Sequence, residues 1–202
     1  MSGPALAQME ITEWMYSGTG GEFIEFTNTS TSAIDLSGWS YDDDSQAPLS
    51  FDLSGFGTVA AGESVVITED DAAQFRIHWA LADSVKVLGG YTNNIGRADQ
   101  INLYNAALAA VDTFSYGDAV YLGTVRTQGA SGTPTSLAAL ASPVVTTDWV
   151  LAAVGDAYGS FVSTNGDIGN PGRLVTVVPE PGTWALLLAG LGVVTAVARR
   201  RA

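Results

Sequence analysis

Short runs of alternating hydrophobic and polar residues recur along the middle of this 202-residue chain. They are rich in β-branched and aromatic residues, and clusters of Gly, Asn, Asp and Ser separate them. An alternation with a period of two is the pattern of a strand that buries one face, and frequent turn residues are typical of a β-sandwich or barrel. We therefore predict strands at residues 23–27, 64–68, 84–88, 100–104 and 111–116.

One segment has helical spacing instead. Ala72, Phe75 and Trp79 lie three to four residues apart and follow a Thr-Glu-Asp-Asp tetrapeptide at residues 68–71. The tetrapeptide resembles a capping box, in which the first residue would cap the helix. We expect one short helix here, and a long loop over residues 129–142, where Gly, Ser, Thr and Ala predominate.

The C-terminal end has a different pattern. Three features follow one another there: Pro179, Glu180 and Pro181, then an uncharged apolar run over residues 183–198, then Arg199, Arg200 and Arg201. A helix of that length is about the shortest that crosses a hydrocarbon core of about 30 Å, and arginines mark the cytoplasmic side of membrane spans. We predict a transmembrane helix at residues 183–198 with a cytoplasmic anchor of three arginines, and the rest of the chain on the outer side.

The order of these features resembles the PEP-CTERM sorting signal, over residues 176–202. In that family the Pro-Glu-Pro tripeptide is the recognition element of an exosortase, a membrane transpeptidase-like enzyme. The resemblance implies an exported protein that is anchored in the inner membrane before processing and then reaches the cell surface or the extracellular matrix. An exosortase-type enzyme and the membrane are the implied partners, and exopolysaccharide or a surface protein is a further candidate.

The N-terminal end offers one part of an export signal. Residues 5–7 read Ala-Leu-Ala before Gln8, which fits a small-residue cleavage site, whereas the basic and apolar regions that precede such a site are missing. We interpret residues 1–8 as the remnant of a signal peptide whose front part belongs to a longer reading frame. A chance Ala-Leu-Ala in an alanine-rich protein is the alternative.

Composition narrows the class of partner. The chain carries 21 acidic and 8 basic residues and no cysteine, with a formal net charge of −13. This charge repels nucleic acid, and the lack of cysteine excludes disulfides and thiolate metal sites. About 170 residues remain between the two terminal signals, which is enough for one domain with a sizeable core.

Residues 9–173 resemble the lamin-tail domain. Ile11-Thr12-Glu13 and residues 22–28 and 34–39 carry the likeness at the front, and Trp149 with the Gly-Asn-Pro-Gly segment at 169–172 carries it at the end. The resemblance implies an immunoglobulin-like β-sandwich over residues 9–175 that acts as a binding or scaffolding module. The expected fold class is therefore all-β with one short helix, plus the C-terminal transmembrane helix.

Residue chemistry gives two local predictions inside that domain. Gly38 allows a backbone angle that side chains resist, so that Leu36 and Trp39 can anchor a turn on the core. For Glu22 and Glu25 we expect a role at a ladder edge or as loop caps, rather than in catalysis.

Catalytic groups are hard to assemble from this sequence. His78 is its only histidine, which excludes a multi-histidine metal site, and we expect it to pack within the helix. The chain has no Gly-x-Ser-x-Gly elbow, phosphate-binding loop or dinucleotide fingerprint, and nothing selects a pair of carboxylates for glycoside hydrolysis. We predict a protein that is not an enzyme and has no cofactor. A secreted hydrolase that uses carboxylate chemistry is the alternative.

Two acidic clusters remain. Asp42, Asp43 and Asp44 could supply part of a calcium site, since calcium takes about six to eight oxygen ligands, but the full EF-hand pattern is missing. They are a weak calcium candidate, and a calcium-dependent adhesion module is the second alternative function. The acids at residues 69–71 are explained by their favourable interaction with a helix dipole.

Overall fold

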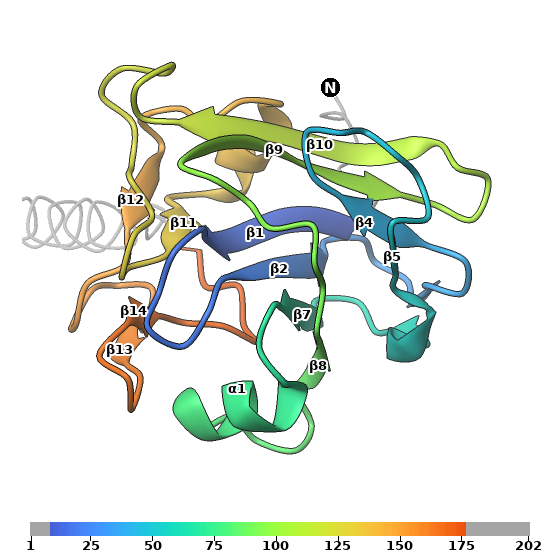
Figure 1. Ribbon diagram of the computed structural model, residues 1–202, viewed down its shortest axis with the longest axis horizontal. Helices are drawn as coiled ribbons and strands as arrows, with labels where there is room; N and C mark the ends of the chain where they lie inside the picture. The colour runs from blue at the N-terminus through green and yellow to red at the C-terminus, as the bar shows by residue number, and fades with distance from the viewer. Residues whose placement is uncertain (1–8, 177–202) are drawn as a thin grey trace, which may run out of the picture.

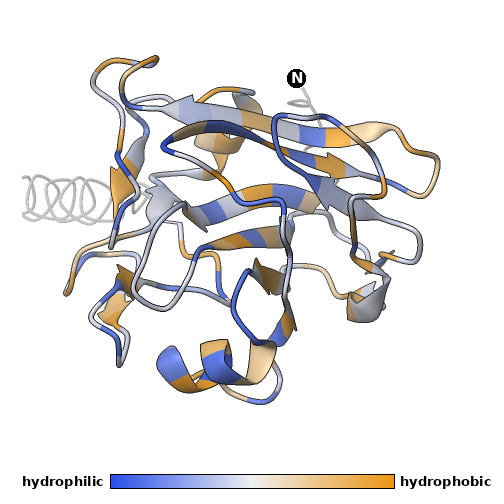
Figure 2. Cartoon of the chain, viewed as in Figure 1, coloured by the Kyte–Doolittle hydropathy of each residue, from blue (hydrophilic) through white to orange (hydrophobic). Residues whose placement is uncertain are grey.

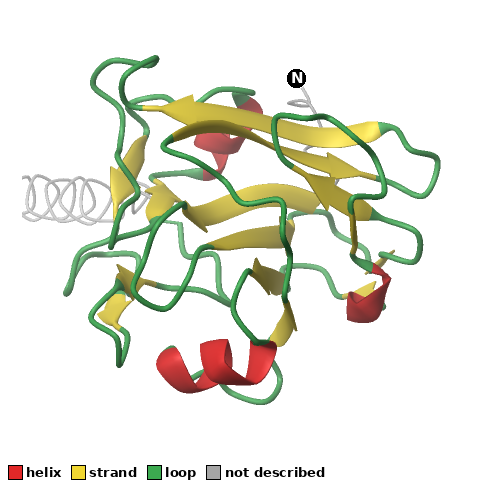
Figure 3. Ribbon diagram, in the orientation of Figure 1, coloured by secondary structure: helices red, strands yellow, loops and turns green. Residues whose placement is uncertain are grey.

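Two β-sheets lie face to face in the computed structural model, which describes residues 9–176 (Figure 1). Strands and loops make up most of this part of the chain (Figure 3). The signal remnant at 1–8, the sorting tripeptide, the predicted span at 183–198 and the terminal arginines lie outside the described residues. Among residues 9–176, no helix has the length and apolar character needed to span a bilayer.

The larger sheet has six strands, and all neighbours are antiparallel except the parallel pair β7–β8. Its order is β12 (Trp149–Leu151), β11 (Gly132–Pro134), β1 (Met9–Met15), β2 (Phe23–Asn28), β7 (Ser64–Thr68) and β8 (Lys86–Gly89).

The smaller sheet has four antiparallel strands. Its order is β10 (Ala110–Gly117), β9 (Ala98–Tyr104), β4 (Ser40–Asp42) and β5 (Phe51–Asp52). Two short ladders join β3 (Ile34–Asp35) to β6 (Thr58–Val59) and β13 (Phe161–Val162) to β14 (Ile168–Gly169). The helical elements of the described part are α1 (Ala72–His78) and the 3-10 turns η1 (Ser54–Phe56) and η2 (Leu137–Ala141).

The main core fills the space between the two sheets. Hydrophobic and polar positions alternate along the strands, as the bands on β1 and β9 show (Figure 2). Trp14 of β1 lies at its centre, with ring centroids 4.9 Å from both Phe114 of β10 and Trp149 of β12. Ile24 and Phe26 of β2 point into the same core. This packing of two sheets through their apolar faces is that of an immunoglobulin-like sandwich.

A second, smaller core lies on the opposite face of the larger sheet. There α1 packs Phe75 and Trp79 against Phe23 of β2, with ring centroids 5.5 and 5.6 Å from it. Figure 1 shows α1 and the β13–β14 ladder on the side of this sheet that is remote from β9 and β10. Both faces of β1 and β2 are therefore covered, and every residue of the two strands is buried.

The strand predictions are confirmed, with ends that shift by up to two residues: β2, β7, β8, β9 and β10 occupy the five predicted segments. The turn prediction is confirmed as well. Gly38 has φ of +75°, Leu36 is fully buried, and Trp39 is half-buried against the main core.

Two predictions are wrong in detail. Asp71, not the first residue of the tetrapeptide, caps α1, because its carboxylate accepts the backbone N–H groups of Ala73 and Gln74 at 2.9 and 3.2 Å. The segment 129–142 is not a continuous loop, since it contains β11 and η2. Strand β11 is short and pairs with residues far away in the chain, Trp14 on one side and Leu151 on the other, which local composition does not reveal.

Candidate functional site

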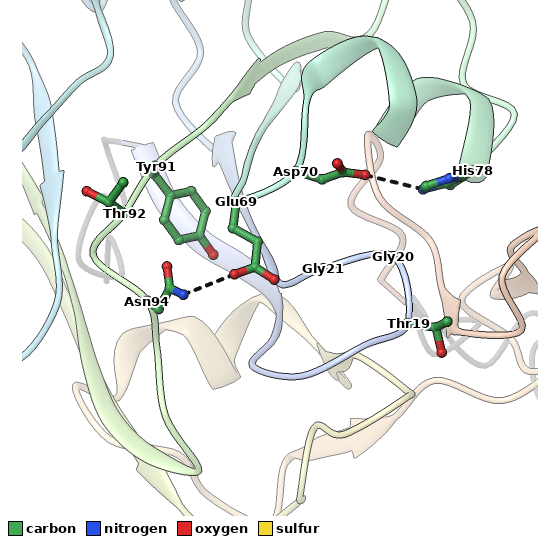
Figure 4. A pocket seen from close by; sticks show the side chains of 9 residues that line it. All are labelled: Thr19, Gly20, Gly21, Glu69, Asp70, His78, Tyr91, Thr92 and Asn94. Carbon is green, nitrogen blue, oxygen red and sulfur yellow. Dashed lines mark hydrogen bonds and ion pairs between the residues drawn. The ribbon is translucent and has the colours of Figure 1, made fainter.

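A cavity of about 590 Å³ opens beside α1, at one end of the larger sheet (Figure 4). Four segments form its walls: residues 19–21 between β1 and β2, Glu69 and Asp70 between β7 and α1, His78 at the end of α1, and Tyr91, Thr92 and Asn94 after β8. The volume is within the range of about 300–1,000 Å³ that is usual for small-molecule sites.

The turn from β7 into α1 places the two acids of this cavity. Thr68 is the last residue of β7, and Glu69 follows it. Both donate a hydrogen bond to the backbone carbonyl of Glu22, which precedes β2: Thr68 Oγ1 at 2.9 Å and Glu69 N at 3.3 Å. Gly89 of β8 passes so close to the turn that a Cβ there would lie 2.4 Å from the Asp70 carbonyl oxygen. Because Gly89 has no side chain, the end of β8 can pack directly against the start of α1.

The charge of the cavity walls is negative. One carboxylate oxygen of Glu69 accepts Asn94 Nδ2 at 3.1 Å, and Asp70 Oδ2 lies 3.4 Å from His78 Nδ1. None of the nine described residues that line the cavity is a lysine or arginine. The walls therefore offer more hydrogen-bond acceptors and negative charge than donors.

Tyr91 is the buried aromatic residue of the cavity wall. Its exposed fraction is 2%, and Figure 4 shows its hydroxyl directed toward the Glu69 carboxylate. The hydroxyl lies near enough to the Glu22 carboxyl to act on its pKa as a hydrogen-bond donor, which lowers that pKa. Even so, no group in the described part of the chain meets regular hydrogen-bond geometry with it. Burial raises the pKa of the Tyr91 hydroxyl well above its usual range, so this group stays neutral. A buried polar group in this state is uncommon and calls for an explanation.

Glu22 lies behind Tyr91. Both of its carboxylate oxygens accept the backbone N–H of Ile95, at 3.0 and 3.2 Å, so this residue caps the loop before β9. Burial, with a contribution from the negative charge of Glu69, raises the pKa of Glu22 to about 8. The loop-capping role expected for Glu22 is confirmed.

A second group of buried acids holds the C-terminal segment of the domain. Glu13 and Glu25 are cross-strand neighbours on β1 and β2. Glu13 Oε1 accepts the backbone N–H of Asn170 at 2.8 Å and also the Ser131 hydroxyl, and Glu25 Oε2 accepts the N–H of Gly172 at 2.7 Å. Burial raises the pKa of both, that of Glu13 to about 8. Glu25 is therefore a loop cap as well.

The acidic triplet at the end of β4 is a turn network. Asp42 is fully buried and accepts the Ser45 hydroxyl and Asn93 Nδ2, each at 2.7 Å, on different oxygens. Asp43 accepts the backbone N–H of Ser45 at 2.9 Å, and Asp44 is exposed. Within residues 9–176, no three His, Asp or Glu side chains are grouped so that they could hold a metal ion. The calcium site at this triplet stays a prediction.

The sequence located His78 on its helix but did not bring the cavity together. No sequence pattern marked Tyr91, Asn94 or the Gly20-Gly21 turn as part of a cavity. They lie beside Glu69 and Asp70 only in the completed fold, in which β8 pairs parallel with β7. A glycine pair between two strands and an asparagine pair after another strand were the visible hints.

Comparison with known families gives two matches. The Lamin Tail Domain family model matches residues 3–118, which is more than half of the chain, and the PEP-CTERM protein-sorting motif matches residues 177–201. A search of curated proteins finds no match to this chain. Strands β11 and β12, which follow residue 118, extend the larger sheet beside β1. The chain thus belongs to the lamin tail domain family and carries a PEP-CTERM sorting motif behind that domain.

Proposed function

We propose that this protein is an exported, non-catalytic binding or scaffold module that an exosortase-type system sorts to the cell surface or the extracellular matrix. The observation that carries the proposal is the order of the two families, a lamin tail domain followed by a PEP-CTERM motif. Pro179, Glu180 and Pro181 are the proposed recognition element.

The apolar run at 183–198 is the proposed inner-membrane anchor before processing, with Arg199, Arg200 and Arg201 on the cytoplasmic side. After processing, the folded domain would be the part that meets exopolysaccharide or a surface protein. The negative charge of the chain supports a partner other than nucleic acid.

The placement of the carboxylates favours binding over hydrolysis. Glu13 and Glu25 are adjacent, but they have exposed fractions of 3% and 1% and lie beneath the C-terminal segment, where no substrate reaches them. Glu69 and Asp70 are accessible but follow each other in one turn, whereas glycoside hydrolysis requires two carboxyl groups that flank the scissile bond.

Cell fractionation tests the sorting part of the proposal. The chain, expressed in a host with an exosortase-type enzyme and behind a complete signal peptide, should appear in surface or matrix fractions. A Pro179→Ala/Glu180→Ala/Pro181→Ala variant should accumulate in the membrane fraction, while Val154→Ala, at an exposed loop position, should behave as wild type. A wild-type protein that stays in the cytosol would contradict the proposal.

An activity assay tests the non-catalytic part. Purified protein incubated with neutral, acidic and cationic polysaccharides should release no shortened products. Product formation that disappears in Glu69→Gln would make the secreted hydrolase the correct function.

A further inference from the structure

The cavity beside α1 has the features of a site for a small cation. Glu69 and Asp70 both reach it. Each Glu69 oxygen accepts one hydrogen bond, from Glu22 N–H at 3.2 Å and from Asn94 Nδ2 at 3.1 Å, and can accept another. Asp70 Oδ2 has only the His78 ring at 3.4 Å. Two carboxylates next to a hollow attract a positive charge.

Tyr91 is an independent sign that a ligand completes the site. Tyr91 lines the cavity, and its hydroxyl is buried. The Glu22 carboxyl lies near this hydroxyl, but no group of the described chain meets regular hydrogen-bond geometry with it. An unsatisfied buried hydroxyl costs folding free energy, about 1–3 kcal/mol in general. A bound group that hydrogen-bonds to this oxygen would remove that cost.

The shape and lining of the cavity select the kind of cation. A metal ion would need more converging acidic or imidazole ligands than this site has, since no such group of three occurs within residues 9–176. A lysine side chain would need apolar walls for its aliphatic stem. The lining here is Thr, Gly, Asn, acids, one histidine and one tyrosine ring, without an aliphatic side chain among its nine residues. Such walls match a ring that carries hydroxyl groups together with its ammonium group.

We propose that this cavity binds an amino-sugar residue with a free ammonium group, as part of a cationic polysaccharide. The ammonium group donates to the Glu69 carboxylate and to the Tyr91 oxygen, which lie on the same side of the cavity (Figure 4). The sugar hydroxyls meet the side chains of Asp70, Thr92 and Asn94. This inference rests on the proposed binding function and names the ligand class for it.

Calorimetric titration of the full-length chain in detergent micelles tests the inference with three probes. These are a β-1,4-linked glucosamine tetramer, the same tetramer fully N-acetylated, and a lysine-rich peptide of equal charge. The glucosamine tetramer should bind, and raised salt should weaken its binding because charges contribute. The acetylated tetramer, which lacks the ammonium groups, should bind at least about tenfold more weakly.

Three variants assign the binding to this cavity. Glu69→Gln and Asp70→Asn should each weaken glucosamine-tetramer binding about tenfold, because each removes a charged hydrogen bond. Asp83→Asn removes the same charge at an exposed position that does not line the cavity, and should bind as wild type. Tyr91→Phe should weaken binding several-fold while its melting temperature stays equal or rises, because the deleted hydroxyl has no regular partner in the folded protein. A merely structural role for Tyr91 would lower stability instead.

Three results would overturn the inference: equal binding of the acetylated tetramer, binding of the lysine peptide alone, or equal loss of affinity in Asp83→Asn. Failure to bind any of the probes would overturn it as well, and would leave the sorting result from cell fractionation intact. Shortening of the tetramer during titration would instead contradict the non-catalytic function while the ligand class still held.

Discussion

The two faces of the larger sheet are both buried, but they are built from different residues. The face toward β9 and β10 is apolar and aromatic, with Trp14 at its centre. The opposite face combines the small apolar cluster under α1 with the carboxyl groups of Glu13 and Glu25. The first face gains stability from contact area, whereas the second depends on buried acids that hold a peripheral segment by hydrogen bonds.

The largest effect is expected on the apolar face. Trp14→Ala should lower the free energy of unfolding by about 3–5 kcal/mol, because it leaves a cavity between Phe114 and Trp149. Urea unfolding measures this change. Trp39→Ala is the matched control and should cost clearly less, since Trp39 is half-buried. Equal losses in the two variants would show that the depth of burial in the main core does not set the cost of losing a tryptophan.

The acidic face should respond more locally. Glu13→Ala removes the acceptor for the Asn170 N–H and the Ser131 hydroxyl, and should cost about 1–3 kcal/mol. Amide hydrogen exchange should show faster exchange at Asn170 and Gly172 and little change in β9. Glu13→Gln keeps a carbonyl oxygen and should lose less. Uniformly faster exchange in both sheets would mean that this acid supports the whole fold and not one segment.

The difference between the faces also explains how much the sequence could predict. Short runs of β-branched and aromatic residues between turn residues, many of them alternating with polar residues, located β2, β7, β8, β9 and β10. These patterns could not locate the contacts of Glu13 and Glu25, since an acid in a strand normally indicates a solvent-exposed face. Their partners, Asn170 and Gly172, are 157 and 147 residues away, and only the completed fold brings them together.

The buried acids should also make the stability of the protein depend on pH. Burial raises the pKa of three acids, each beside another acid, from the ordinary value of 4.5 to about 8: Glu10 near Asp112, Glu13 near Glu25 and Glu22 near Glu69. The folded state therefore holds these protons where the unfolded chain has already lost them. Their contribution to stability is complete below pH 4.5 and is lost as the pH rises toward 8.

Exposed acids act in the opposite direction at low pH. Hydrogen bonds from Ser37 and Ser54 lower the pKa of Asp35 and Asp52, so their contribution is lost as the pH falls below the ordinary value of 3.8. Urea unfolding should therefore find the protein more stable at pH 5 than at pH 8. Glu13→Gln should reduce that difference, and a wild-type protein that gains stability from pH 5 to pH 8 would refute the assignment of protonated buried acids.

The cap of α1 should give a smaller effect. Asp71→Ala removes the acceptor for two backbone N–H groups at the start of the helix and should cost about 1 kcal/mol. Asp71→Asn keeps a capping oxygen and should cost less. Thermal melts followed by circular dichroism measure both variants, and a larger loss for Asn than for Ala would contradict the capping geometry.

The smallest effect is expected from calcium at the Asp42, Asp43 and Asp44 turn. Asp42 resembles Glu13 in that neutral donors of the protein occupy its oxygens, here the Ser45 hydroxyl and the Asn93 side chain. A calcium ion would have to displace them and still find about six to eight oxygens, of which this turn supplies few. A ligand that binds only the folded state raises its stability by mass action, so melts with millimolar calcium and with chelator should differ by about a degree or less. The Asp42→Asn/Asp43→Asn/Asp44→Asn variant should show the same small difference. A rise of many degrees in wild type that this variant lacks would make the turn a genuine calcium site and favour the adhesion function over the plain scaffold.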